Sequence, residues 1–128
     1  MDKITSEELI KIAMETRNPK KLLHHNFTGT VGCALITNKN NVYLGVNLDL
    51  ACGIGFCAEH SAIASMITNK EFIIKKIVSV GKKNEILPPC GRCRELLFQV
   101  SKENLKTKII LGNKKEVTLK KLLPVLWE

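Results

Sequence analysis

Three of the chain's five cysteines lie in two short segments, each at a point where a loop is followed by a helical pattern. The first segment is Cys57-Ala58-Glu59-His60, and the second is the PPCGRCR stretch from Pro88 to Arg94. A predicted helix and strand separate them, so a fold that uses the three thiols together has to bring two helix N-termini side by side. A lone C-x-x-C is more often a redox dithiol or a partial metal clip, but the two motifs together are specific.

The position of these thiols at helix starts favours metal binding. A helix N-terminus carries roughly half a positive charge and free N–H groups, which lower the pKa of a thiol and stabilise the thiolate that a metal requires. Cys57, Cys90 and Cys93 are one ligand short of a closed structural zinc site, so the sequence predicts zinc with a coordination position open for water. Cys33 and Cys52 show no paired ligand spacing, and we expect both to be small apolar residues.

Glu59 is the candidate catalytic residue, because it follows Cys57 by two residues. On a helix this spacing turns its side chain about 200° away from the direction of that ligand, so it does not chelate the same metal. From the first turn of the helix it can still reach over the open position, where a carboxylate serves as general base and acid. The alternative is a zinc-stabilised protein without catalysis, but a structural site has no use for such an acid.

The composition is that of an ordinary globular protein. With 128 residues, 45% of them hydrophobic, we expect one domain over residues 1–128 with its own core. No apolar run approaches the roughly 18 residues of a membrane span and the N-terminal segment is too charged for a secretory signal, which predicts a cytoplasmic protein. The net charge of +8 comes from scattered lysines with few aromatic residues between them, which favours a solvated surface over a nucleic-acid-binding or polynucleotide-editing protein.

Hydrophobic periodicity predicts alternating helices and strands. Thr5 or Ser6 begins a first helix that Asn18-Pro19 ends, and a strand at 30–37 turns through 38–41 into a second strand at 42–46. Further helices are predicted at 58–69, at 91–100 and, capped by Thr118, near 118–124, with strands at 73–80 and 108–111. A hairpin followed by strands joined through helices implies a mixed sheet with helices on its faces, a three-layer α/β/α fold.

The chain resembles the cytidine deaminase superfamily, specifically its small members with three cysteine ligands, which include cytidine deaminases and blasticidin S deaminases. Besides the two cysteine motifs, the likeness covers Val31-Gly32-Cys33-Ala34-Leu35, Gly45-Val46-Asn47 and Leu122-Leu123-Pro124. It implies a mixed five-stranded sheet of the cytidine deaminase type. It also implies a homotetramer with sites near subunit boundaries.

The resemblance implies a zinc-dependent hydrolase that converts cytidine or deoxycytidine to uridine or deoxyuridine, in pyrimidine salvage. Cys57, Cys90 and Cys93 would hold the zinc ion, and Glu59 would carry protons from the attacking water to the ring nitrogen and then to the leaving amino group. The substrate is then a small cytosine nucleoside rather than a nucleic acid.

The resemblance also implies contacts around the substrate. Asn47 and Asp49 occupy positions that grip the ribose, with Asp49 one methylene shorter than the family's glutamate, and Ala58 belongs to the same set. Arg94 matches a position whose guanidinium donates to a thiolate sulfur, whereas His60 stands where cytidine deaminases often carry arginine. Taken without the resemblance, Asn47 and Asp49 are ordinary turn formers and Arg94 is a solvated helix residue. His60 is either a hydrogen-bond donor near the metal or a packed helix residue.

Three departures from the family pattern concern the choice of substrate. The pattern places a stacking phenylalanine at Gly29, for which Phe27 is the nearby replacement. The loop over residues 47–57 is one residue shorter and has Gly53 near the place of a tyrosine. The C-G-R-C-R form and the Trp127-Glu128 end are closer to blasticidin S deaminases. A deaminase of blasticidin-type nucleoside antibiotics is therefore the alternative to a cytidine deaminase.

Overall fold

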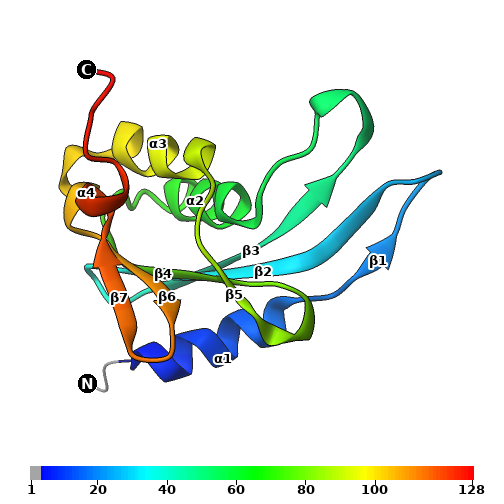
Figure 1. The fold of residues 1–128 in the computed structure, drawn as a ribbon, viewed down its shortest axis with the longest axis horizontal. Helices are drawn as coiled ribbons and strands as arrows, with labels where there is room; N and C mark the ends of the chain where they lie inside the picture. Colours follow the sequence, from blue (N-terminus) through cyan, green and yellow to red (C-terminus); the bar gives the residue numbers. More distant parts are fainter. Residues whose placement is uncertain (1–3) are drawn as a thin grey trace.

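The structure, a computed structural model, describes residues 4–128 and has three layers. One helix covers one face of a mixed β-sheet, and two helices cover the other face, as Figure 1 shows. The helices are α1 (Ser6–Thr16), α2 (Ala58–Thr68), α3 (Gly91–Val100) and α4 (Leu119–Leu122), with 3-10 turns at Ala51–Gly53, Lys82–Asn84 and Lys102–Lys106. The predicted α/β/α class is confirmed.

The sheet has seven strands in the described residues, so the expected number of five is wrong. They are β1 (Lys20–Lys21), β2 (Phe27–Thr37), β3 (Val42–Asp49), β4 (Ile74–Val80), β5 (Ile86–Leu87), β6 (Lys108–Gly112) and β7 (Lys115–Thr118). The order is β1-β2-β4-β6-β7, with β3 paired to β2 and β5 paired to β4, and only the β4–β6 pair is parallel. β1, β5 and β7 hold two to four residues each, too few to produce a hydrophobic period.

Two separate clusters of buried side chains hold the layers together. One lies between the sheet and the helices α2 and α3, and it includes Leu35, Met66 and Leu97. The other lies between the sheet and α1, and it includes Leu9, Ala34 and Val78. Neighbouring residues of a strand, such as Ala34 and Leu35 of β2, belong to different clusters because side chains of a strand point to opposite faces. Both faces of the sheet are therefore covered by packed side chains.

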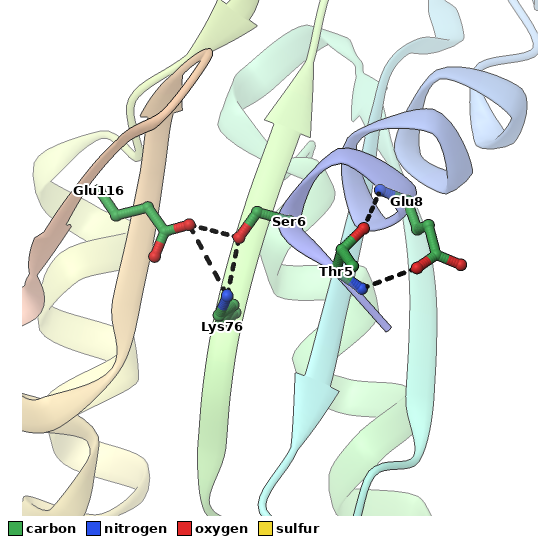
Figure 2. Close-up of polar contacts among 5 residues, drawn as sticks. All are labelled: Thr5, Ser6, Glu8, Lys76 and Glu116. Carbon is green, nitrogen blue, oxygen red and sulfur yellow. Dashed lines mark hydrogen bonds and ion pairs between the residues drawn. The ribbon is translucent and has the colours of Figure 1, made fainter. Parts of the chain in front are cut away.

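Polar contacts fix the start of α1 against the sheet (Figure 2). Thr5 and Glu8 form a capping box, with the Glu8 N–H 3.1 Å from the Thr5 hydroxyl and the Thr5 N–H 3.0 Å from the Glu8 carboxylate. Lys76 of β4 donates to the Ser6 hydroxyl at 2.7 Å and lies 3.7 Å from the carboxylate of Glu116 on β7, which also accepts from Ser6. Of the two predicted starts, Thr5 is thus the capping residue, and Ser6 joins the helix to two strands.

Close backbone packing sets the position of α2. Gly45 of β3 lies under this helix, where an added Cβ would come within 2.3 Å of the Ala62 nitrogen and 2.5 Å of the Ala58 carbonyl oxygen. The N-terminus of α2 can therefore lie directly on the sheet only because residue 45 has no side chain. Among residues 4–128, no helix is long and apolar enough to cross a membrane.

Candidate active site and metal centre

The three predicted thiol ligands meet at the N-termini of α2 and α3. Cys57 is the N-cap of α2, Cys90 is the N-cap of α3, and Cys93 lies in the first turn of α3. The Sγ atoms of Cys57 and Cys90 are 3.5 Å apart, those of Cys90 and Cys93 are 3.7 Å apart, and all three lie within 4.8 Å of one another. These separations exclude disulfides, whose sulfurs are about 2.05 Å apart.

The cluster fits a zinc ion. Tetrahedral zinc with Zn–S bonds of about 2.3 Å separates its sulfurs by roughly 3.8 Å, close to the two sulfur distances measured here. Burial raises the pKa of Cys93 and of Cys57, and the charge of Glu59 raises both further. For Cys90, backbone N–H groups of α3 and hydrogen bonds with the other two thiols together outweigh burial and lower the pKa. A divalent cation offsets the mutual repulsion of three thiolates, so the donor set is one that zinc can occupy.

Glu59 lies beside this cluster in the first turn of α2. Its side chain is only 5% exposed, and burial raises the pKa of its carboxyl group above the ordinary value, against smaller opposing effects from hydrogen bonding with its own backbone, Ser79 and Cys93. The helix start thus presents the thiol of residue 57 and the carboxyl group of residue 59 to the same region, as the spacing in the sequence predicted. A buried carboxyl group with a raised pKa is suited to exchange protons near neutral pH.

A cavity of about 380 Å³ opens onto Cys57, Cys90 and Glu59, whereas the buried Cys93 is not among the described residues that line it. This volume lies within the range of small-molecule sites, which runs from about 300 to 1,000 Å³. The cavity is lined by the predicted residues Asn47, Asp49, Cys57, Ala58, Glu59 and Cys90, and by the further residues Val31, Leu48, Gly55, Phe56, Ser79, Leu87, Pro88 and Arg92. The fold therefore brings the predicted metal, acid and substrate residues to one place.

The predicted substrate residues differ in how free their polar groups are. The Asn47 side chain accepts from the Val31 N–H at 3.0 Å and donates to the Thr30 hydroxyl at 2.9 Å, which holds an irregular part of β2. One N–H of its amide remains for a ligand, because an amide nitrogen carries two. Asp49 is exposed at the end of β3, and Ala58 places a helix-start N–H at the cavity.

The basic residues near the thiols are placed differently from the expectation. Arg94 donates from Nε to the Pro89 carbonyl at 2.9 Å and from Nη1 to the Leu122 carbonyl at 3.3 Å, so its guanidinium steadies the loop before Cys90. Arg92, which sequence reasoning passed over, lines the cavity. The signal for it was its position inside the C-x-x-C motif, at the start of α3.

His60 packs against a ring that sequence reasoning also missed. Its imidazole stacks on Phe56 with the ring centroids 6.2 Å apart, and its Nδ1 is buried without a hydrogen-bond partner in the described part of the chain. Burial, with a smaller contribution from Arg92, lowers the pKa of His60, which favours the neutral ring. Of the two roles considered for His60, the contacts support the packed one.

The structure explains why position 29 carries glycine. Gly29 has a φ of +74°, and a Cβ there would lie 2.1 Å from the Asn18 carbonyl oxygen, so no phenylalanine fits. Phe27, the expected replacement, pairs across the sheet with Asp49 and is not among the described residues that line the cavity. Phe56 is the aromatic residue of that lining. It directly precedes Cys57 in the sequence, which is the signal that could have identified it.

The two remaining cysteines lie outside the metal cluster. Cys33 is fully buried in the core under α2, as expected for a small apolar residue. Cys52 is exposed, in the 3-10 turn between β3 and α2, so the expectation of an apolar packing role is wrong for it. Gly53 follows with a φ of +67° and nothing within 4 Å of a Cβ. The loop between β3 and α2 extends away from the helices (Figure 1). Cys52 therefore does not pack into the core, although cysteine is a residue type that is usually buried.

Comparison with known proteins agrees with this geometry. Residues 4–108 match the family described as the cytidine and deoxycytidylate deaminase zinc-binding region. The cytidine deaminase of Halalkalibacterium halodurans is 31% identical over 121 residues, which cover 91% of this chain and 89% of the relative. The blasticidin-S deaminase of Bacillus cereus is 25% identical over 127 residues, covering 92% and 89%.

A solved structure shows the same fold and a related sequence. The crystal structure of cytidine deaminase from Mycobacterium leprae superposes with a TM-score of 0.77 at 30% identity, and the match covers 93% of this chain and 97% of that one. The family match spans most of the chain and includes both cysteine motifs. With its three thiols positioned to hold a metal ion, the chain belongs to the zinc-dependent cytidine and deoxycytidylate deaminase family.

Proposed function

We propose that this protein hydrolyses the 4-amino group of cytidine and deoxycytidine, giving uridine or deoxyuridine and ammonia, as an enzyme of pyrimidine salvage. The observation that carries the proposal is a cluster of three thiols at zinc spacing, two of which line a cavity of about 380 Å³ together with a buried glutamate. Membership of the deaminase family and the similarity to a bacterial cytidine deaminase support the choice of substrate.

The chemistry divides between the metal and Glu59. A zinc ion held by Cys57, Cys90 and Cys93 would supply a Lewis acid that makes water nucleophilic at neutral pH. Glu59 accepts one proton from the water that attacks C4 and delivers it to the ring nitrogen. It then accepts the proton of the new C4 hydroxyl and delivers it to the amino group, so that the C4–N bond breaks, the C4 carbonyl forms and ammonia leaves. The raised pKa of the buried carboxyl group suits both halves of this exchange.

Other residues of the cavity orient the nucleoside. We assign the ribose hydroxyls to the free amide N–H of Asn47 and to the Asp49 carboxylate, both of which lie at the end of β3. The backbone N–H of Ala58 is available for a carbonyl oxygen of the base. Arg92 places a positive charge beside the thiols, where it offsets part of their negative charge.

Phe56 supplies the aromatic surface against which the base packs. Two hydrogen bonds of 2.9 Å between its backbone and that of Leu48 hold it in place, and His60 backs the ring. Stacking of a base on an aromatic ring contributes about 1–3 kcal/mol. We therefore expect Phe56→Leu to raise KM for cytidine by about 5- to 150-fold, with a smaller change in kcat because ground state and transition state lose the same contact.

The matched control is Phe27→Leu, which makes the same change outside the cavity. Steady-state kinetics on cytidine should show a near wild-type KM for this variant, since Phe27 contacts β3 and β1 rather than the cavity. A KM effect confined to Phe27→Leu would assign the stacking role to Phe27 instead.

The second candidate function is deamination of blasticidin-type antibiotics, which also carry a cytosine ring. It is favoured by the similarity to the blasticidin-S deaminase of Bacillus cereus over 92% of the chain, and by a Gly29 that cannot be replaced by phenylalanine. Because both kinds of substrate carry the same base, a comparison of their turnover rates distinguishes the two functions.

The deciding experiment is loss of absorbance in the cytosine band with zinc-loaded protein on cytidine, deoxycytidine and blasticidin S in parallel. We expect turnover of the two simple nucleosides and none of a single-stranded oligonucleotide. Turnover of blasticidin S alone would replace the proposed function with antibiotic inactivation. Absence of turnover on every cytosine compound would refute the proposal of a nucleoside deaminase.

We also propose that the enzyme is a cytoplasmic homotetramer, by resemblance to small members of the family. The apolar side chains of Leu44 on β3 and Ile67 on α2 are exposed in the single chain and are available for contacts between subunits. Light scattering should give a mass of about four times 14.3 kDa. A mass near that of one chain would contradict this assembly.

A further inference from the structure

Ser79 occupies a core position directly beneath the candidate active site. It lies on β4, where it pairs with Cys33 of β2 and Leu87 of β5. Its strand neighbours Val78 and Val80 belong to the core that faces α1, whereas Cys33 belongs to the core that faces α2. Because side chains alternate along a strand, Ser79 points toward α2 and the catalytic glutamate.

The hydroxyl of Ser79 is buried and has no hydrogen-bond partner. The residue is 3% exposed, and its Oγ forms no hydrogen bond with any described residue. A buried hydroxyl without a partner is unfavourable by about 1–3 kcal/mol, and alanine would fill the same place without that penalty. A polar group in this situation requires an explanation beyond packing.

Two neighbouring side chains can accept from the Ser79 hydroxyl, the Cys33 thiol opposite it on β2 and the Glu59 carboxylate, and the carboxylate is the stronger acceptor. Ser79 and Glu59 both line the main cavity, and both line a second, much smaller space of about 10 Å³. The other residues around that space are apolar or proline: Ile77, Val78, Leu87, Pro89, Ile109 and Ile110. A space this small is at the lower limit for one water molecule, so it leaves the hydroxyl room to turn without admitting a ligand.

We propose that Ser79 is a positioning residue for Glu59, whose carboxylate accepts a hydrogen bond from the Ser79 hydroxyl and is thereby held in the orientation that serves the C4 centre of the substrate. The proposal rests on the proposed deaminase function. Ser79 reaches the carboxyl group from the sheet side, whereas the substrate approaches from the cavity. The hydroxyl therefore acts through Glu59. The influence of Ser79 on the pKa of Glu59 agrees with this closeness.

A set of three variants tests the role by kinetics. Ser79→Ala removes the hydroxyl, and we expect kcat to fall by about 10-fold with KM for cytidine nearly unchanged. Ser79→Thr and Ser79→Val carry the same extra bulk and differ in the hydroxyl, so threonine should retain about 10-fold more kcat than valine. Combined with Glu59→Gln, the Ser79→Ala change should have no further effect on kcat, since it acts through the same group.

A structural role alone predicts a different pattern. If Ser79 only fills the core, Ser79→Ala keeps full kcat, and this outcome would overturn the proposal while cytidine turnover by the wild type leaves the proposed function standing. Urea unfolding and zinc content should show that Ser79→Ala is folded and metal-loaded under the assay conditions, although it has lost the proposed hydrogen bond to Glu59. Equal kcat for Ser79→Thr and Ser79→Val would also count against positioning, because both variants fill the core and only threonine carries the hydroxyl.

A crystal structure of the zinc-loaded wild type provides a test that needs no turnover. We expect the Ser79 Oγ within about 3.2 Å of a carboxylate oxygen of Glu59. A hydroxyl bonded instead to a backbone carbonyl of β2 or β4 would overturn the inference, even for an enzyme that proves to act on another substrate.

Discussion

Replacing Glu59 by glutamine is expected to lower kcat on cytidine by about 10²–10⁴-fold, the range that general acid–base catalysis contributes. An amide has the same shape as the carboxyl group but cannot accept the proton of the attacking water. Glu59 is buried and its pKa is raised by that burial, so removal of the charge relieves desolvation rather than breaking the fold. Absorbance assays at saturating cytidine measure the effect.

The Glu59→Gln experiment needs a control that changes a carboxylate to an amide outside the cavity. Glu15→Gln makes this change on the exposed side of α1, across the sheet from the cavity, and should keep wild-type kinetics. Zinc content and thermal unfolding should match the wild type in both variants. Full kcat in Glu59→Gln would falsify the role given to this residue and with it the proposed mechanism.

Replacing Cys90 by serine is expected to remove zinc and activity together. Loss of groups that merely orient metal ligands already weakens binding by 10- to 100-fold, so loss of a ligand should weaken it by at least about 100-fold. Cys90 is the most exposed member of the cluster, which makes the substitution the least disruptive of the three to the core. Metal analysis after dialysis and turnover on cytidine are the two measurements.

Chelation gives an independent measurement of the same site. A ligand that binds only the folded protein stabilises it by about 2.7 kcal/mol at 100 times its Kd, so a chelator should lower the melting temperature of the wild type. It should not lower that of Cys90→Ser. Cys52→Ser, at the exposed cysteine outside the cluster, should respond to the chelator as the wild type does. Unchanged zinc affinity in Cys90→Ser would place the metal elsewhere.

The main helices and strands could be predicted because each is long enough to show its own period. The helix at 91–100 has the predicted bounds, and the start of α1 at Thr5 agrees with one of the two predicted caps. β2, however, begins at Phe27 rather than at residue 30, because the pairing of β2 with β3 is irregular between Thr28 and Gly32 and breaks the alternation there. The lysine pair of β1 has no hydrophobic pattern at all, so only its pairing with β2 makes it a strand.

The site residues also divide into those that the local sequence could predict and those that depend on the folded structure. Ligand type, spacing and the helix-start setting all lie within short stretches of chain, so Cys57, Cys90, Cys93 and Glu59 could be predicted together with the metal that suits them. Which arginine lines the cavity could not be predicted. Arg92 and Arg94 stand on either side of Cys93, and Arg94 donates to two backbone carbonyls that come near it only after folding, whereas Arg92 lines the cavity.

The sequence by itself determined the chemistry: three soft ligands with an open position, and an acid two residues from the first of them. Only the tertiary structure decided what surrounds that chemistry, because contacts across the sheet join residues that are far apart in the chain. The β2–β4 register pairs Ser79 with Cys33 and places it beside the small space that Glu59 also lines. The bridge between Leu48 and Phe56 brings Phe56 to the cavity, whereas Phe27, which pairs with Asp49, is not among the described residues that line it. Register and side-chain direction depend on the whole sheet, so no local pattern could contain them.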